Sequence, residues 1–356
     1  MVNVSTELFT ADAIAAHTEL ARTTYSEAAV LDRAHFRWKH LEGPCGASIA
    51  VNMHDGQMLV GRSLIQLRDF QIDPSKVVRA GVIFDLMLAP GYRSAQQFLA
   101  LVRAQWSTDR VDLVLHTSNA TSDPLYRMLL RYPISFRMAA FGLPVRIKRI
   151  LRKLLGWTVP GIDMLTAPWR WALRAAASLG RAATGIRFEL GMPAEADLQS
   201  VVQRFRQVAG PHLRRDRAFL EWRFQNATLF KATIATVVRT DRVCGYVVWR
   251  KIELEGIEFL VLMDFVLDDD LTSLQRLVVR LELARRACEE GADILFVMAN
   301  TKNKLAAQVC NLPLIRIPER YLPHPTPIFV HPKRDELAWL RQQEDMFLTL
   351  GDLDYF

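Results

Sequence analysis

The sequence repeats itself at a nearly constant spacing, and this repeat limits the possible folds more than any other feature. Trp38 and Trp222 lie 184 residues apart, and so do Gly61 and Gly245. Two more matches follow in the same order, an Asp within an apolar run and an Asn at the end of the next run: Asp85 with Asp264, and Asn119 with Asn300. Self-similarity at a fixed offset indicates repeated structural units. Because 356 residues are enough for two ordinary domains, we expect two copies of one domain.

Each copy has the same order of secondary-structure signals. Apolar residues alternate on both sides of the turn sequences HDG (54–56) and TDR (240–242), which predicts a β-hairpin in each copy. An apolar strand, a helix, a strand that ends in Asn and a second helix follow. In the second copy, residues 271–291 have apolar side chains at helical spacing and end on Gly291. The pattern predicts an α+β (α/β) fold, in which each copy is a mixed, mostly antiparallel sheet flanked by helices.

Basic residues gather between the two copies. Residues 137–187 contain ten Lys or Arg and one acid, whereas the whole chain has a net charge of +7. In VRIKRILRKLLGW (145–157), one helical face is apolar and the other is basic, and Trp157 stands at the end. Such a helix lies in the headgroup layer of an anionic membrane or packs as a linker, and we favour the linker. We divide the chain into a first copy (1–144), a basic amphipathic helical connector (145–185) and a second copy (186–356).

Several classes of protein do not fit the composition. No apolar run reaches the about 18 residues that span a bilayer, and the N-terminal stretch contains acids and lacks a basic start. We expect a cytoplasmic protein, with peripheral attachment at the inner face of the cytoplasmic membrane left open. The four Cys are scattered and the His residues form no ligand pattern, so we expect no metal. The sequence pI of about 9.4 is the one feature that would suit binding to nucleic acid, and we do not expect nucleic acid as a partner.

The motifs of the first copy carry a family resemblance. One strand runs to Pro90, a turn with Tyr92 and Arg93 leads into a helix, and the next strand ends in Asn119, seven residues before Tyr126. This order resembles the Gcn5-related N-acetyltransferase (GNAT) superfamily, here as a tandem pair. In that superfamily a loop of the pattern [QR]-x-x-G-x-[GA] holds the diphosphate of acetyl coenzyme A through backbone N–H groups. The chain is similar to tandem members often associated with bacterial polysaccharide assembly.

The resemblance implies an acyl-CoA site in the first copy. Arg93 matches the first residue of the loop pattern. The residues that would hold the cofactor are Leu88, Arg93, Ser94, Ala95, Gln96, Gln97, Phe98 and Asn119. Gln96 stands where the central glycine belongs, so its side chain would block the diphosphate or be forced to a positive φ. An ordinary strand-to-helix turn, capped by Ser94, is the alternative.

Acyl transfer to an amine needs a base for the amine proton and an acid for the departing thiolate. The resemblance assigns the acid to Tyr126, whereas a tyrosine with its ring in the core is the alternative. Asp85 on the central strand and His116 on the next are the candidate bases, because side chains on neighbouring strands can share a water molecule. Asp85 has a counterpart in Asp264, which favours a structural role for both.

The second copy lacks the features of such a site. Asp268, Asp269 and Asp270 stand where the diphosphate would lie, and Ala307 replaces the tyrosine. Carboxylates stabilise a helix N-terminus and repel a phosphate. We therefore expect the second copy to be non-catalytic.

Two functions remain open. We favour an N-acyltransferase that uses acetyl-CoA or another acyl-CoA as cosubstrate and acylates the amino group of a sugar or of a lipid-linked polysaccharide precursor. Its partners would be acyl-CoA, an amine-bearing sugar or glycolipid and, as an option, an anionic membrane. The alternative is a non-catalytic GNAT-like binding or scaffold protein of a polysaccharide-assembly system, and Gln96 keeps this alternative open.

Overall fold

The computed structural model describes residues 2–25, 31–119, 122–157, 161–322 and 326–353. The chain forms two compact units, and each is built from three separate segments. Unit 1 contains residues 1–137, 211–231 and 324–344, and unit 2 contains residues 138–210, 232–323 and 345–356. The sequence predicted domain limits of 1–144, 145–185 and 186–356, and these limits stay predictions. Unit 1 contains segments of the first and third ranges, and unit 2 contains segments of all three.

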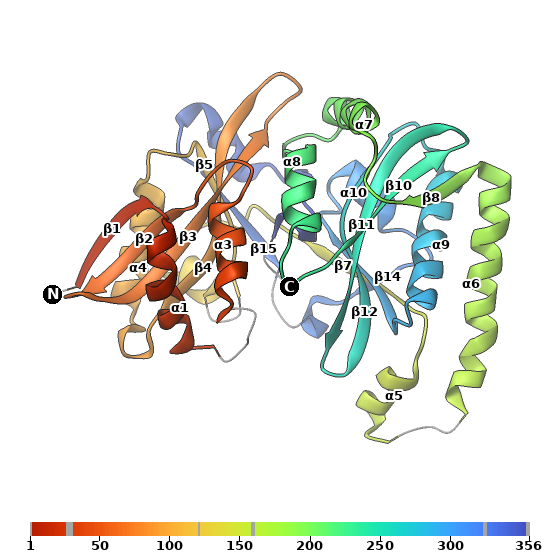
Figure 1. Ribbon diagram of the computed structural model, residues 1–356, viewed down its shortest axis with the longest axis horizontal. Helices are drawn as coiled ribbons and strands as arrows, with labels where there is room; N and C mark the ends of the chain where they lie inside the picture. The colour runs from red at the N-terminus through yellow and green to blue at the C-terminus, as the bar shows by residue number, and fades with distance from the viewer. Residues whose placement is uncertain (1, 26–30, 120–121, 158–160, 323–325, 354–356) are drawn as a thin grey trace. The chain divides into compact units, whose positions relative to one another are not determined.

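Unit 1 contains one mixed sheet (Figure 1). In spatial order its strands are β1 (Val2–Leu8), β2 (Ile49–Asp55), β3 (Met58–Gln71), β4 (Val77–Leu88), β5 (Leu113–Thr117), β15 (Pro327–Pro332) and β6 (Phe136–Arg137), and the short β9 (His212–Leu213) pairs with β3. All neighbours are antiparallel except β4 and β5. The predicted hairpin joins β2 to β3, and Gly56 in its turn has a φ of +59°.

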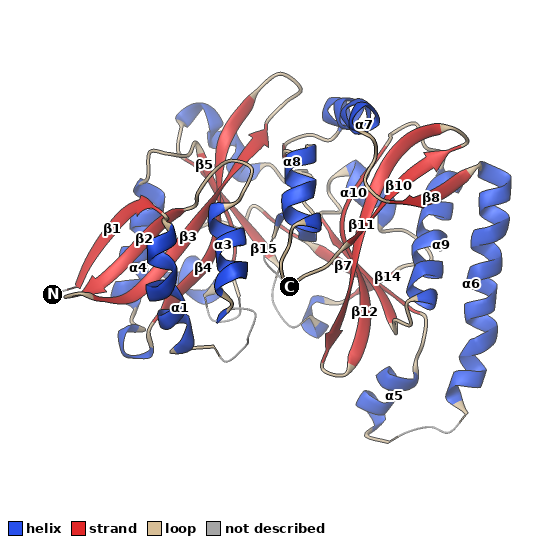
Figure 2. Cartoon of the chain, in the orientation of Figure 1, coloured by secondary structure: helices blue, strands red, loops and turns tan. Residues whose placement is uncertain are grey.

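Unit 2 contains a sheet of the same design. In the corresponding order its strands are β8 (Ile186–Leu190), β10 (Thr233–Arg239), β11 (Arg242–Leu254), β12 (Ile257–Leu267), β13 (Ile294–Ala299), β7 (Ala139–Pro144) and β14 (Ile315–Ile317). Again one pair is parallel, β12 with β13. The predicted α+β class, with mixed and mostly antiparallel sheets flanked by helices, is confirmed (Figure 2).

The two sheets exchange one strand each. In unit 1 the place between β5 and β6 is taken by β15, which comes from the C-terminal part of the chain. In unit 2 the place between β13 and β14 is taken by β7, which directly follows β6 in the sequence. Each sheet is therefore completed by a strand from the other half of the chain.

Helices cover both sheets. In unit 1 the helical segments are η1 (Ala11–Ala13), α1 (Ile14–Arg22), α3 (Arg33–Leu41), η2 (Pro90–Tyr92), α4 (Ala95–Ser107), η3 (Leu125–Leu129), α8 (Arg217–Leu220), η4 (Glu221–Gln225) and η6 (Asp335–Gln342). In unit 2 they are α5 (Lys148–Leu155), α6 (Ile162–Thr184), α7 (Glu195–Val208), α9 (Ser273–Glu289), α10 (Lys304–Val309), η5 (Glu319–Tyr321) and η7 (Leu350–Asp352). The predicted helix at 271–291 is α9; a capping box of Thr272 and Gln275 starts it, and Gly291 follows it with a φ of +76°.

The connector contains two helices of different character. Helix α6 runs along α9 (Figure 1), and Gly180 allows the close approach, because a Cβ there would lie 2.6 Å from Val278 Cγ2. Helix α5 has no buried residue, and the side chain of Leu154 is 74% exposed. Within the described part of the chain, no helix has both the length and the apolar character to cross a membrane.

The two tryptophans of the repeat lie together inside unit 1. Trp38 in α3 and Trp222 in η4 stack with their ring centroids 5.3 Å apart. The indole Nε1 of Trp38 donates a hydrogen bond to the Trp222 carbonyl oxygen (2.7 Å), and Trp222 Nε1 donates to the Trp38 carbonyl oxygen (3.0 Å). Both side chains are buried. This reciprocal pair ties segment 211–231 to α3.

We expect Trp38→Phe to destabilise unit 1. The change keeps an aromatic ring but removes the N–H that binds the Trp222 carbonyl, and an unpaired buried polar group costs about 1 to 2 kcal/mol. Urea titration should show this loss in the free energy of unfolding. Trp339→Phe is the control, since Trp339 is 45% exposed and its change should stay within about 0.5 kcal/mol. Equal effects of the two changes would contradict a stabilising role for the indole bond.

Candidate functional site

The parallel strands of unit 1 separate where β4 continues beyond its partner. Strand β5 pairs with β4 only at residues 80–82, and β4 runs on to Leu88. Among the described residues, no strand or bridge pairs with this side of β4 after Val82. Backbone N–H and C=O groups that lack a strand partner are available to an extended ligand. The free side of β4 leads through η2 to the first turn of α4.

A bulge at Asp85 shapes this free stretch. The pairing of β3 with β4 shifts between Arg62 and Leu64, and Asp85 has a φ of +51°. This conformation is unfavourable for a residue with a Cβ, so neighbouring contacts must stabilise it. Asp85 Oδ2 lies 3.0 Å from Lys39 Nζ and 2.7 Å from His40 Nε2. Arg62 Nε donates a hydrogen bond to the Asp85 carbonyl oxygen at 3.4 Å.

The electrostatics of this cluster make Asp85 a weak base. Burial by itself would raise the pKa of Asp85, but the Lys39 ammonium, the His40 hydrogen bond and Arg62 outweigh it and hold the pKa well below its usual range. Burial lowers the pKa of His40, so its imidazole is neutral, donates from Nε2 to Asp85 and accepts at Nδ1 from Ser48 Oγ, 3.1 Å away. A carboxylate with a strongly lowered pKa accepts protons poorly. These contacts favour a structural role for Asp85, which stabilises the bulge.

Sequence reasoning missed the three partners of Asp85. Lys39 and His40 follow Trp38 in α3, and Arg62 lies in β3 two residues after Val60 and two before Leu64. All three side chains are buried. A basic residue within an alternating apolar strand was the available signal, because a buried cation needs a buried acceptor.

His116 and Tyr126 form a second cluster. The His116 ring stacks on Phe329 of β15, with centroids 4.7 Å apart, and lies 4.3 Å from the Tyr126 ring. Neither ring nitrogen of His116 has a hydrogen-bond partner among the described residues. Burial, with His331 nearby, lowers the pKa of His116 to about 3, and burial raises the pKa of Tyr126. Both side chains are therefore neutral near pH 7.

The structure does not bring Asp85 and His116 together. His40, the partner of Asp85, packs against Phe9 and Phe36, which belong to the core beneath α1 and α3. His116 packs against Phe329, which belongs to the core beneath α4. The two side chains lie on opposite faces of the sheet, so the expected shared water molecule between them does not fit. Tyr126 lies on the face of His116.

The first turn of α4 presents free backbone donors. Ser94 is the N-cap, and its Oγ accepts a hydrogen bond from the backbone N–H of Gln97 (3.3 Å). For the N–H groups of Ala95 and Gln96, the described residues provide no acceptor. Gln96 is exposed and helical, so the expectation of a positive φ at this position is wrong. A side chain at the second position of a helix points outward and leaves the N–H groups accessible.

The other residues of the predicted loop have different surroundings. Arg93 is exposed, and its guanidinium donates to the Leu88 carbonyl oxygen (3.2 Å) and to Thr24 Oγ1 (2.9 Å). Phe98 is 3% exposed and contacts the Tyr126 ring, so it belongs to the core. Asn119 stabilises the turn after β5, where its Oδ1 accepts from the Ser122 N–H (2.9 Å).

In the corresponding turn of unit 2 the acids are paired with arginines, while the first two N–H groups of α9, like those of α4, have no acceptor among the described residues. The capping box of Thr272 and Gln275 starts α9, and the three acids precede the helix rather than opening it. Asp268 binds Arg204 and Arg242, at 2.8 Å each. The remaining acid contacts are Asp270 with Arg239 and Arg242, and Asp269 with Arg276. A phosphate would compete with these carboxylates for the arginines.

The opening between the parallel strands of unit 2 contains a segment of the chain itself. Strands β12 and β13 pair only at residues 259–262 and 294–297. Beyond this point Thr349 forms a bridge with Ala299, and its Oγ1 donates to Asp264 Oδ1 at 2.8 Å. Asn300 Nδ2 donates to the Met346 carbonyl oxygen at 2.8 Å. Residues 346–350 are buried, so the chain fills in unit 2 the place that is free of strand pairing in unit 1.

Comparison with known proteins supports the fold and no more. The sequence matches no family model and no curated protein. The structure is similar to a GCN5-related N-acetyltransferase from Anabaena variabilis, with a TM-score of 0.59, 13% identity, and coverage of 93% of this chain and 73% of that one. It is also similar to an Enterococcus faecalis protein described as a probable N-acyltransferase (TM-score 0.52, 11% identity, 96% and 74% covered).

A third similar structure is the N-myristoyltransferase of Saccharomyces cerevisiae with bound myristoyl-CoA and inhibitors. Its TM-score is 0.57 at 12% identity, and the match covers 92% of this chain and 80% of that one. At such low identity a likeness shows the fold alone. The chain therefore has the fold of the N-acetyltransferases, as the resemblance in its sequence implied.

We expect His116→Leu to reduce the acid sensitivity of folding. In the unfolded chain His116 takes up a proton below its ordinary pKa of 6.5, whereas the folded protein keeps it neutral down to about 3. The unfolded state binds more protons in this window, so stability is complete above pH 6.5 and falls as the pH decreases toward 3. When the pH is lowered from 7 to 4.5, the free energy of unfolding, measured by urea titration, should fall by about 2 kcal/mol less in the variant than in the wild type. The same pH dependence in both proteins would contradict the burial of a neutral imidazole.

Proposed function

We propose that unit 1 binds acyl-CoA and transfers its acyl group to an amine. One observation carries this proposal: the free side of β4 leads directly to a helix N-terminus with unpaired N–H groups. An extended ligand with amide groups pairs with such a strand edge, and a diphosphate binds at such a helix end. Coenzyme A contains both parts. The fold shared with a GCN5-related N-acetyltransferase and with an N-myristoyltransferase that holds myristoyl-CoA supports the same ligand.

The diphosphate would bind at the first turn of α4. The N–H groups of Ala95 and Gln96 have no acceptor among the described residues, and the helix dipole favours an anion there. Arg93 is next to this turn and exposed, so its guanidinium adds a positive charge. We assign the remaining contacts to Leu88, Ser94 and Gln97, which line the path from β4 into α4. Phe98 and Asn119 would act indirectly, through the core and through the turn after β5.

The reaction would use the cluster on the α4 face. The amine nitrogen attacks the thioester carbonyl carbon, the bond from carbon to sulfur breaks, and the proton lost by the amine finally resides on the thiol of coenzyme A. His116 lies one residue beyond Leu115, the last residue of β5 that pairs with β4. Its imidazole has two unpaired nitrogens and lies beside Tyr126, so it is our candidate to accept the amine proton, and its lowered pKa makes it, like Asp85, a weak base. Tyr126 stays protonated near pH 7 and is our candidate to donate to the thiolate.

The acceptor that we propose is the amino group of a sugar or of a lipid-linked polysaccharide precursor. The support is the resemblance of the motifs to tandem proteins associated with polysaccharide assembly. Helix α5 adds to it, because basic residues and exposed apolar residues together suit the surface of an anionic membrane. Such a surface would present a lipid-linked acceptor at the inner face of the cytoplasmic membrane.

A non-catalytic binding protein is the second candidate, and two observations favour it. Leu88 and Thr24 already accept hydrogen bonds from the Arg93 guanidinium, which reduces its freedom to bind a phosphate. The pKa values of Asp85 and His116 also lie far below neutrality, as suits structural groups. Binding of acetyl-CoA without release of free coenzyme A in the presence of amines would support this candidate.

We expect Gln96→Glu to weaken the binding of acetyl-CoA at least tenfold. The new carboxylate would stand at the second residue of α4, where it repels the diphosphate. Titration calorimetry measures the change. The matched control is Leu274→Glu, at the second residue of α9, which should leave the affinity unchanged. A loss with Leu274→Glu, or none with Gln96→Glu, would place the cofactor elsewhere.

We expect Tyr126→Phe to lower turnover by about 10- to 100-fold while the affinity for acetyl-CoA stays the same. The change keeps the ring in contact with Phe98 and His116 and removes only the hydroxyl. Release of free coenzyme A with amino-sugar acceptors is the readout. Tyr132→Phe is the control, because its hydroxyl is bound to the Val330 carbonyl oxygen outside the site, so stability should fall and turnover should not. Full turnover in Tyr126→Phe would remove this residue from the mechanism.

A further inference from the structure

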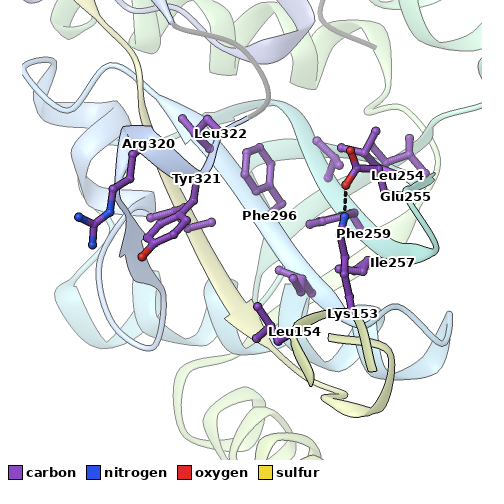
Figure 3. Close-up of a pocket in the computed structure, with 14 residues that line it drawn as sticks. Lys153, Leu154, Leu254, Glu255, Ile257, Phe259, Phe296, Arg320, Tyr321 and Leu322 are labelled. Atoms are coloured by element: carbon purple, nitrogen blue, oxygen red, sulfur yellow. Dashed lines mark hydrogen bonds and ion pairs between the residues drawn. The ribbon is translucent and has the colours of Figure 1, made fainter. Parts of the chain in front are cut away.

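Unit 2 contains a half-open hollow that the proposed acyl transfer does not use. Its volume is about 470 Å³, which lies in the range of small-molecule sites. One face of the sheet forms its floor, with Ile257 and Phe259 from β12 and Phe296 from β13 (Figure 3). Leu154 of α5 and Leu322, just after η5, contribute to its walls. The lining is mostly apolar, so a hydrocarbon chain suits it better than a polar ligand.

The rim of the hollow is basic on one side. Figure 3 shows Arg320 and Tyr321 on one side of the floor and the ion pair of Lys153 with Glu255 on the other. The Arg320 guanidinium lies 4.9 Å from the Tyr321 ring centroid, and it has no ion pair among the described residues. Because the pair of Lys153 and Glu255 is neutral as a whole, Arg320 leaves a net positive charge at the rim. This charge favours an anionic group at the mouth of the hollow.

Helix α5 extends the apolar surface beyond the hollow. Leu154 and Trp157 are 74% and 58% exposed, and Leu155 between them is 49% exposed. The helix is fixed to the sheet by ion pairs: Lys153 with Glu255, and Arg149 with Glu258 and Asp293. The exposed leucines are therefore presented by a tethered helix at the edge of the hollow. An amphipathic helix of this kind lies in the headgroup layer of an anionic membrane.

We propose that this hollow binds one acyl chain of an anionic membrane lipid. The chain lies on the floor of Ile257, Phe259 and Phe296, the lipid phosphate lies at Arg320, and α5 lies among the neighbouring headgroups. The site does not depend on the acyl transfer proposed for unit 1. It differs from general attraction to a membrane surface, because the hollow has a defined volume and, among its described lining residues, one cation without an ion pair.

Binding of single-chain lipids to the full chain tests this proposal. The probes are lysophosphatidylglycerol and lysophosphatidylcholine below their micelle concentrations, with affinities measured by calorimetry. We expect wild type to bind the anionic lipid about tenfold more tightly than the zwitterionic one, as one charge-assisted contact provides. Ile257→Trp fills the hollow and should weaken the binding of both lipids about tenfold. Leu190→Trp is the control on an exposed position of β8 and should leave both affinities unchanged.

A charge reversal tests the phosphate position separately. Arg320→Glu should abolish the preference for the anionic lipid, whereas Arg316→Glu, an equal change at an exposed residue of β14 outside the hollow, should keep it. Arg320→Glu alters only an exposed side chain, so it remains informative if Ile257→Trp does not fold. Unchanged lipid binding in Ile257→Trp, an equal effect of the two Arg changes, or competition by inorganic phosphate alone would each overturn the proposal. Tighter binding of myristoyl-CoA than of lysophosphatidylglycerol at the hollow would overturn the lipid as its occupant.

Discussion

The exchange of strands β7 and β15 is the constraint on which the rest of the structure depends. Without β15, strand β5 would be an exposed sheet edge, and without β7 the same would hold for β13. Neither sheet can therefore be completed by its own half of the chain. In unit 1 the exchanged strand also provides Phe329, on which His116 stacks. The reciprocal bonds of Trp38 and Trp222 fix a second exchanged segment in the same unit.

This constraint explains how two parallel strands can separate without unravelling the sheet. Strand β5 is held on one side by β15 along its whole length, so its other side is free to part from β4 after three paired residues. The bulge at Asp85 turns β4 away, and its cost is offset by contacts with Lys39, His40 and Arg62. The result is an unpaired strand edge in a fixed position, next to the start of α4.

The two units use the same separation differently. Both helices start with two N–H groups that have no acceptor among the described residues, but three acids, paired with arginines, precede the helix only in unit 2. Thr349 and the residues before it fill the opening of unit 2. These contacts support a division of tasks, with the cofactor in unit 1 and recognition of the acceptor or of a surface in unit 2.

The local structure was predictable from the sequence, whereas the pairing of distant segments was not. Alternating apolar residues around turn sequences predicted the hairpins, and apolar residues at helical spacing predicted α9. The exchange of β7 and β15 leaves no local signal, since any strand of the right length can take the sixth place in either sheet. The sequence did not predict that Asp85 and His116 lie on opposite faces of the sheet, because a bulge shifts the alternation of side chains by one residue. The expectation of a positive φ at Gln96 was wrong because Ser94 caps the helix and places Gln96 in its first turn.

Hydrogen–deuterium exchange with and without acetyl-CoA tests the central claim most directly, because it reports the backbone N–H groups themselves. The claim is that the free side of β4 and the start of α4 receive the cofactor, whereas in unit 2 the chain fills the place beside β12 and three acids precede α9. We predict slower exchange at residues 83–97 on addition of acetyl-CoA, with residues 263–275 unchanged. Slower exchange at residues 263–275, or bound acetyl-CoA without any change at residues 83–97, would contradict this account.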